Sequence, residues 1–133
     1  MRRPRKVPIS LYQYFLAAAI ATWLSVSQAA PVIIITNLPA YGSTNDLSGV
    51  VLNVAPAVYA VAAFIYVPGY GWVSKPTCGQ PLSPLQVDGS WSADITTGGS
   101  DSNATRVAAL VVSTNYNQPC LLGAQFIPTN VFA

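Results

Sequence analysis

The residue types in this chain limit the chemistry that it could perform. It contains no histidine, and its only carboxylate side chains are Asp46, Asp88, Asp94 and Asp101. Nucleophilic and general-base catalysis usually need histidine, lysine or a perturbed carboxylate beside the nucleophile. Two aspartates about 5–9 Å apart could form a glycosidase pair. Because Asp88 is explained by its Asp-Gly turn and Asp46 by a loop of cap-forming residues, we expect no enzyme.

A glycine-rich stretch, DITTGGSDSNAT, offers a candidate metal site. It brings Asp94, Asp101 and Asn103 into one loop, and calcium prefers such hard oxygen ligands. The spacing matches no EF-hand, and loops of this composition usually form turns whose side chains bond their own backbone. A structural calcium ion is therefore an expectation that competes with a plain turn. We expect no other cofactor, since two thiols without histidine cannot form a zinc site.

The stretch VPGYGWVSKPTC offers a candidate ligand surface. Its glycines and prolines break the preceding strand and place Tyr70 and Trp72 on a predicted hairpin or edge. These rings could stack on the apolar face of a pyranose while Tyr41, Asn45 and Lys75 orient its hydroxyl groups. The alternative is that Trp72 packs on a disulfide or caps one end of the core. The residues alone leave both interpretations open.

The N-terminal segment, residues 1–29, has the features of a cleaved secretory signal. A basic start is followed by an apolar run from Tyr14 to Val26, and Ser27 and Ala29 occupy the −3 and −1 positions of an A-x-A-like site. That run is shorter than the ~20 residues needed to span a bilayer. We therefore expect cleavage after Ala29, no stable membrane span afterwards, and a secreted, periplasmic or cell-surface location.

Cleavage changes the charge of the protein and defines its redox compartment. Residues 30–133 keep only Lys75 and Arg106 against four aspartates, which gives a net charge of −2. A mildly acidic domain has no electrostatic footprint for nucleic acid or anionic membranes. In an oxidising compartment, Cys78 and Cys120 are expected to form a disulfide.

Residues 30–133 are expected to form a single all-β domain, an immunoglobulin-like sandwich of two antiparallel sheets with about seven strands. Short apolar or alternating runs are separated by clusters of Gly, Pro, Asn, Asp and Ser, without helical periodicity. The predicted strand segments are 32–36, 47–54, 58–67, 71–74, 85–95 and 105–114.

Three of these segments carry finer predictions. Residues 58–67 are apolar on both faces and should form a central strand, whereas 71–74 should form a short edge strand. Residues 85–95 should form a hairpin around Asp88-Gly89, because Gly89 supplies the positive φ of a tight turn. Beyond that turn, Trp91 lies on the apolar face of an alternating strand and should be buried.

Three stretches of the sequence resemble a small immunoglobulin-like module. They are VAAFIYVPGYGWVSKPTC, LQVDGSWSADITTGGSDSNATRVAALVV and NYNQPC, and the likeness covers residues 31–123. Such modules are found in exported bacterial proteins, often beside glycoside-hydrolase-like domains. The resemblance implies a non-catalytic accessory module in a polysaccharide-processing context, with no catalytic residues to transfer.

Two functions follow as expectations. The first is a module that binds polysaccharide or supports a carbohydrate-active protein. The alternative is a structural or adhesion domain that docks another protein, or a second copy of itself, through an exposed sheet edge. The alternative depends on the C-terminal stretch LLGAQFIPTNVFA, in which only AQFIP could form a last strand. We therefore expect the last strand to be incomplete.

Overall fold

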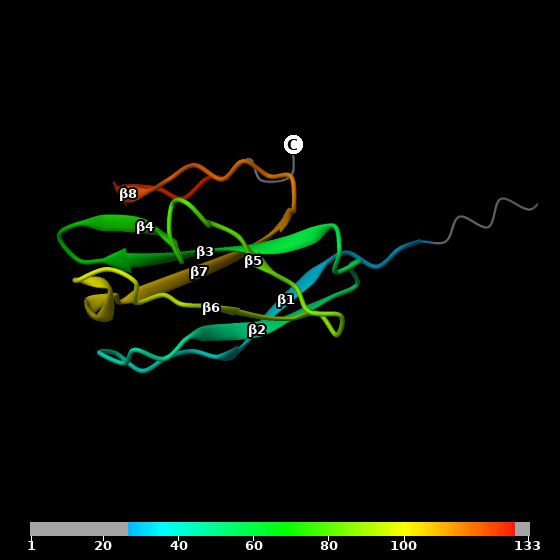
Figure 1. Ribbon diagram of the computed structural model, residues 1–133, viewed down its shortest axis with the longest axis horizontal. Helices are drawn as coiled ribbons and strands as arrows, with labels where there is room; N and C mark the ends of the chain where they lie inside the picture. The colour runs from blue at the N-terminus through cyan, green and yellow to red at the C-terminus, as the bar shows by residue number, and fades with distance from the viewer. Residues whose placement is uncertain (1–26, 130–133) are drawn as a thin grey trace, which may run out of the picture.

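The protein folds as a β-sandwich. The computed structural model describes residues 27–129, so the basic start and apolar run of the predicted signal lie outside the described residues. Two antiparallel sheets, of three and five strands, face one another (Figure 1) and confirm the expected fold class. In the described part, no helix is long and apolar enough to cross a membrane.

The smaller sheet has the strand order β1-β2-β6. Its strands are β1 (Val32–Asn37), β2 (Leu47–Leu52) and β6 (Ser90–Ala93). Gly49 in the middle strand lies opposite Ile35 on one side and Trp91 on the other. A Cβ atom at Gly49 would lie 2.1 Å from the carbonyl oxygen of Ile34 and 2.9 Å from the Trp91 ring. This close approach explains why the position carries glycine.

The larger sheet is organised around β3. Its strands are β3 (Tyr59–Val67), β4 (Gly71–Lys75), β5 (Ser83–Pro84), β7 (Arg106–Ser113) and β8 (Leu122–Ala124). Strand β3 pairs with β4, β5 and β7, which confirms its predicted central position. The prediction of an edge strand at 71–74 is wrong, because β8 pairs with the other side of β4. That last strand is the short LGA segment rather than AQFIP.

Alternation along β3 directs its side chains into two apolar clusters. Val61 and Ile65 are fully buried in the space between the sheets, where they pack with Leu47 and Trp91. Trp91 is therefore in the core, as predicted. The intervening residues of β3, represented by Phe64, lie on the outer face of the larger sheet. This outer cluster is covered by the C-terminal segment (Figure 1), through Tyr116, Leu121 and Ile127.

The predicted hairpin at 85–95 is wrong in its pairing, although its turn is present. Gly89 has a φ of 82°, and the carboxylate of Asp88 accepts hydrogen bonds from the hydroxyl and the amide of Ser90. These bonds lower the pKa of Asp88. The flanking strands pair with different sheets, β5 with β3 and β6 with β2. Val87 beside the turn is 98% exposed, so no alternating strand leads into it.

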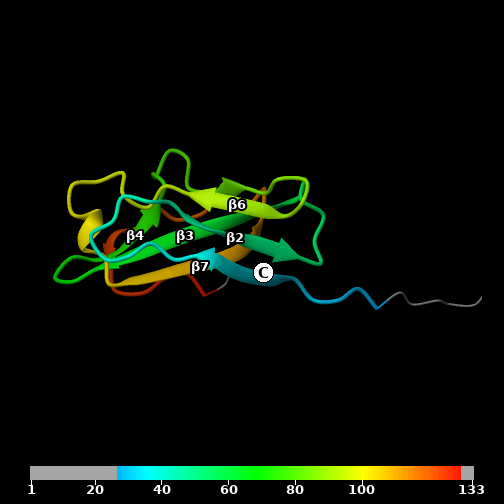
Figure 2. The same cartoon turned by 90° about the horizontal axis from the view of Figure 1, so that it is seen from below.

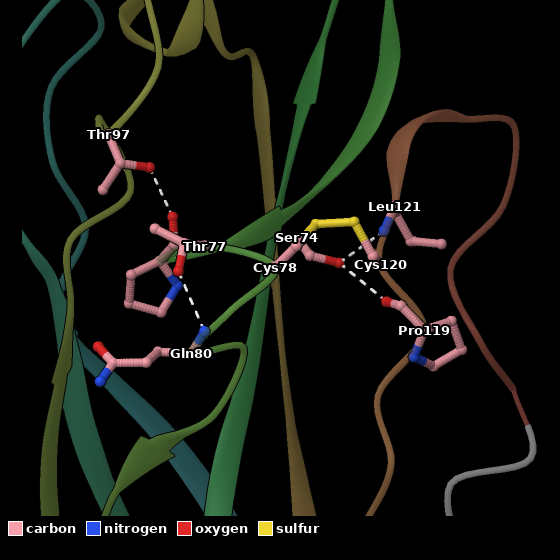
Figure 3. The surroundings of a disulfide bond; sticks show 9 residues. Ser74, Thr77, Cys78, Gln80, Thr97, Pro119, Cys120 and Leu121 are labelled. Carbon is pink, nitrogen blue, oxygen red and sulfur yellow. Dashed lines mark hydrogen bonds between the residues drawn. A yellow bond between two sulfur atoms is a disulfide. The ribbon is translucent and has the colours of Figure 1, made fainter.

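The predicted disulfide is present and joins the segment that follows β4 to the C-terminal segment. The Cα atoms of Cys78 and Cys120 are 5.1 Å apart, and the two residues are 42 positions apart in sequence. Beside the disulfide, the Ser74 hydroxyl donates a hydrogen bond of 3.1 Å to the Pro119 carbonyl and accepts one of 2.9 Å from the Leu121 amide (Figure 3). This cluster holds the segment that covers the outer face of the larger sheet.

Candidate functional site

The predicted ligand and metal residues lie mostly at one end of the sandwich. The β1–β2 loop, the β3–β4 turn and the loop between β6 and β7 gather there, as Figures 1 and 2 both show. Two backbone hydrogen bonds link these loops to each other and to the larger sheet. The Gly42 amide donates to the Ser102 carbonyl at 3.1 Å, and the Thr105 amide donates to the Tyr66 carbonyl at 2.9 Å.

One hollow at this end has a volume of about 710 Å³, and we name it the aromatic groove. It lies between the loop 38–43 and the segment 101–107, and Trp72 of β4 contributes to its lining. Tyr41 also lines it and is 72% exposed. Two of the predicted ligand residues, 31 positions apart in sequence, are thus brought to one groove.

Trp72 packs against the larger sheet and also borders a groove. Its ring packs beside the outer cluster of the larger sheet, and it also lines the aromatic groove. Its centroid lies 5.5 Å from that of Tyr66, in an edge-on arrangement with an interplanar angle of 62°. Tyr66 in turn lies under the guanidinium of Arg106, 5.2 Å from its ring centroid. Strand register places Tyr66 opposite both Trp72 and Arg106, so these side chains form a row across three strands.

A second hollow of about 470 Å³ lies beside the disulfide, and we name it the disulfide groove. Tyr70, Lys75 and the two cysteines line it, together with residues of the 97–101 loop. Tyr70 is 55% exposed. The predicted ligand residues therefore divide between two grooves, with Tyr70 and Lys75 in this one. Asn45 is exposed but lines neither groove.

The predicted ligand residue Lys75 has a buried side chain that is already paired within the protein. The residue is 3% exposed, and its ammonium group forms an ion pair with the carboxylate of Asp101, itself 6% exposed. The ammonium also donates to the Thr97 hydroxyl at 3.1 Å, while the Gly98 amide donates to the Asp101 carboxylate at 2.5 Å. Both charges are thus compensated, as burial of ionised groups requires.

The three predicted calcium ligands are placed differently from one another. Asp101 is paired with the Lys75 ammonium, a cation that competes with any metal for the same oxygen. Asp94 accepts hydrogen bonds from the amide and hydroxyl of Thr96. This is the pattern expected of a plain turn, in which a side chain bonds nearby backbone. Asn103 ends the short 3-10 helix η2 (Asp101–Asn103). Within residues 27–129, no group of three or more His, Cys, Asp or Glu side chains could hold a metal. Calcium stays a prediction.

Sequence reasoning missed Arg106 as a site residue. Its guanidinium is exposed at the start of β7 and lines the aromatic groove. The signal was present in the alternation of TRVAALVV, which puts Arg106 on the same face as Ala108 and Leu110. What the pattern could not show was that Tyr66 of β3 would lie directly opposite.

The fold and this end of the molecule define a disulfide-bonded, two-sheet β-sandwich with an aromatic groove at its loops. No protein-family profile, curated protein or solved structure matches the chain. The function must therefore be inferred from the chemistry of the groove.

Proposed function

We propose that this protein is a non-catalytic accessory module that binds carbohydrate, or positions a carbohydrate-active partner, through the aromatic groove. The observation that carries the proposal is the joint lining of this groove by Tyr41 and Trp72. Its volume of about 710 Å³ is in the range of small-ligand sites. An exposed tyrosine in such a site offers a large, rigid surface at little cost in conformational entropy.

The lining suits a sugar in its polar contacts as well. A pyranose has one apolar face that can lie on an aromatic ring, and hydroxyl groups around its rim. Ser43, Thr96, Ser102 and Thr105 line the groove and carry hydroxyl groups that both donate and accept hydrogen bonds. The groove thus offers ring surface and hydroxyl partners together, which a purely apolar hollow would not.

The same lining supports a binding role rather than hydrolysis. Glycosidases ordinarily use a pair of carboxyl groups that flank the scissile bond. Asp101 is the carboxylate that lines the aromatic groove in the described residues, and it is already paired with Lys75. We also propose export with removal of residues 1–29, since disulfides persist mainly in oxidising compartments.

Affinity electrophoresis of the oxidised, exported protein through a panel of neutral plant and microbial polysaccharides tests the proposal. We expect at least one polysaccharide to retard the protein. Tyr41→Ala should lose this retardation without unfolding, because the side chain is mostly exposed. Tyr70→Ala is the matched control. Tyr70 is also an exposed tyrosine, but it lines the disulfide groove and not the aromatic groove. If Tyr70→Ala loses the retardation and Tyr41→Ala keeps it, the carbohydrate site is in the disulfide groove and the proposal for the aromatic groove is wrong.

A second candidate function is self-association through β1. This edge strand exposes Val32, Ile34 and Ile35 by 40–44% each. A strand edge with apolar side chains is a template for pairing with another chain, here a second copy in antiparallel register. Sedimentation equilibrium tests it: a dimer that Ile34→Lys dissociates would support the candidate, and a strictly monomeric protein would exclude it.

A further inference from the structure

The aromatic groove has an unbalanced charge. Its charged lining residues are Asp101 and Arg106. The carboxylate of Asp101 is 7% exposed in its side chain and is neutralised by the Lys75 ammonium. Lys75–Asp101 is the ion pair found within residues 27–129, so no carboxylate in this part of the chain compensates Arg106.

The remaining aspartates are occupied elsewhere. Asp46 accepts a hydrogen bond of 2.9 Å from the Ser92 hydroxyl, and Asp88 is held by Ser90 in its turn. Asp94 is held by the amide and hydroxyl of Thr96. None of the three lines the aromatic groove. An anion that enters this groove therefore meets one free positive charge and no free negative charge from the described lining.

Arg106 lies beside the aromatic side chains at the edge of the groove. Its guanidinium lies over the Tyr66 ring, and Tyr66 is fixed in turn by the edge-on contact with Trp72. A cation–π contact does not use the N–H groups of a guanidinium as hydrogen-bond donors to an acceptor, so they can still bind a ligand. Two parallel N–H groups match the two oxygens of a carboxylate, which is the strongest common form of charge-assisted hydrogen bonding.

We propose that the groove binds an acidic polysaccharide, one whose sugar rings carry a carboxylate as uronic acids do. The ring lies against Tyr41 and Trp72, and its carboxylate accepts two hydrogen bonds from Arg106. This inference rests on the proposed carbohydrate function and specifies its substrate class. Because residues 30–133 carry a net charge of −2, general attraction of polyanions is weak, and binding depends on this local contact.

The test compares acidic polymers with their neutral forms. Affinity electrophoresis of the oxidised, exported protein is run through polygalacturonate and alginate, and through the methyl-esterified form of each. We expect the free acids to bind about tenfold or more tightly than the esters, as one charge-assisted contact implies. Arg106→Gln should remove that preference, and Arg106→Lys should restore only part of it, because lysine keeps the charge but not the planar fork.

Several outcomes would overturn the inference, and they are distinguishable from failure of the proposed function. Binding of neutral polysaccharides, with equal affinity for acids and esters, would refute the carboxylate preference and leave carbohydrate binding intact. Equal retention by dextran sulfate would indicate general anion binding and also refute it. If no polysaccharide retards a protein with an intact far-UV spectrum, both the inference and the proposed function are wrong.

Discussion

The two grooves share Asp101 but differ in the state of their cation. In the disulfide groove, Lys75 is buried and its charge is neutralised by Asp101. In the aromatic groove, Arg106 is exposed and rests on an aromatic ring. Strand register produces the difference: Lys75 lies opposite Ala63, on the face between the sheets, whereas Arg106 lies opposite Tyr66, on the outer face. A cation whose residue lines a groove is thus not by itself available to a ligand.

Burial also separates the two cations energetically. Removal of one partner from a buried ion pair leaves an uncompensated charge in a poorly solvated place. Substitution of an exposed charged residue changes the free energy of unfolding little, because water solvates the charge in both the folded and the unfolded state. The comparison therefore assigns Lys75 to stability and Arg106 to recognition, and each assignment has a measurable consequence.

The largest expected effect comes from the pair in the disulfide groove. Asp101→Ala should lower the free energy of unfolding by about 3–5 kcal/mol, since it strands the buried Lys75 ammonium. Arg106→Gln should change it by only about 0.5 kcal/mol, as for most surface substitutions. Equilibrium urea denaturation measures both. Similar small losses in the two variants would contradict the comparison.

A double variant separates the charge from the loop geometry. The Asp101 carboxylate also accepts a hydrogen bond from the Gly98 amide. Removal of the carboxylate therefore leaves both this backbone donor and the Lys75 ammonium without their partner. In Lys75→Met/Asp101→Leu, both charges are absent, and replacement of a buried pair by apolar residues is often neutral or stabilising. We expect it to recover most of the stability lost in Asp101→Ala. No recovery would show that the loop hydrogen bond, rather than the charge, carries the effect.

The next largest effect concerns the disulfide. Replacement of Cys78 and Cys120 by serine should lower the free energy of unfolding by about 2–4 kcal/mol, because the link closes a long loop in the unfolded chain. Neither cysteine lines the aromatic groove. Carbohydrate retention should therefore persist at temperatures where the variant remains folded. Loss of retention from a folded variant would show that the two grooves are coupled.

Sequence patterns predicted those features that depend on neighbouring residues or on composition. The apolar runs at β3 and β7, the burial of Trp91 and the pairing of the two cysteines follow from local alternation and composition. The failures share another cause. The edge assignment of β4 and the hairpin at 85–95 depend on which distant strands pair, a choice that local alternation does not encode.

The candidate site illustrates the same limit. Lys75 forms its ion pair with Asp101, which lies 26 residues later in sequence. Arg106 lies 40 residues after Tyr66, the residue whose ring its guanidinium lies over. Both cations are visible in the sequence, yet only long-range pairing decides which is buried. Tyr41 and Trp72 were identified by residue type, whereas their common groove required the folded loops.

The smallest expected effect is a difference in salt dependence between the two cations. The Debye length falls from ~10 Å at 0.1 M to ~3 Å at 1 M ionic strength, which screens exposed charges much more than buried ones. Sodium chloride should therefore weaken the preference for polygalacturonate over its methyl ester, which depends on exposed Arg106. The stability difference between the wild-type protein and Asp101→Ala should stay nearly constant over the same range. A salt-independent acid preference would mean that Arg106 acts from a site shielded from solvent, and the contrast between the two grooves would fail.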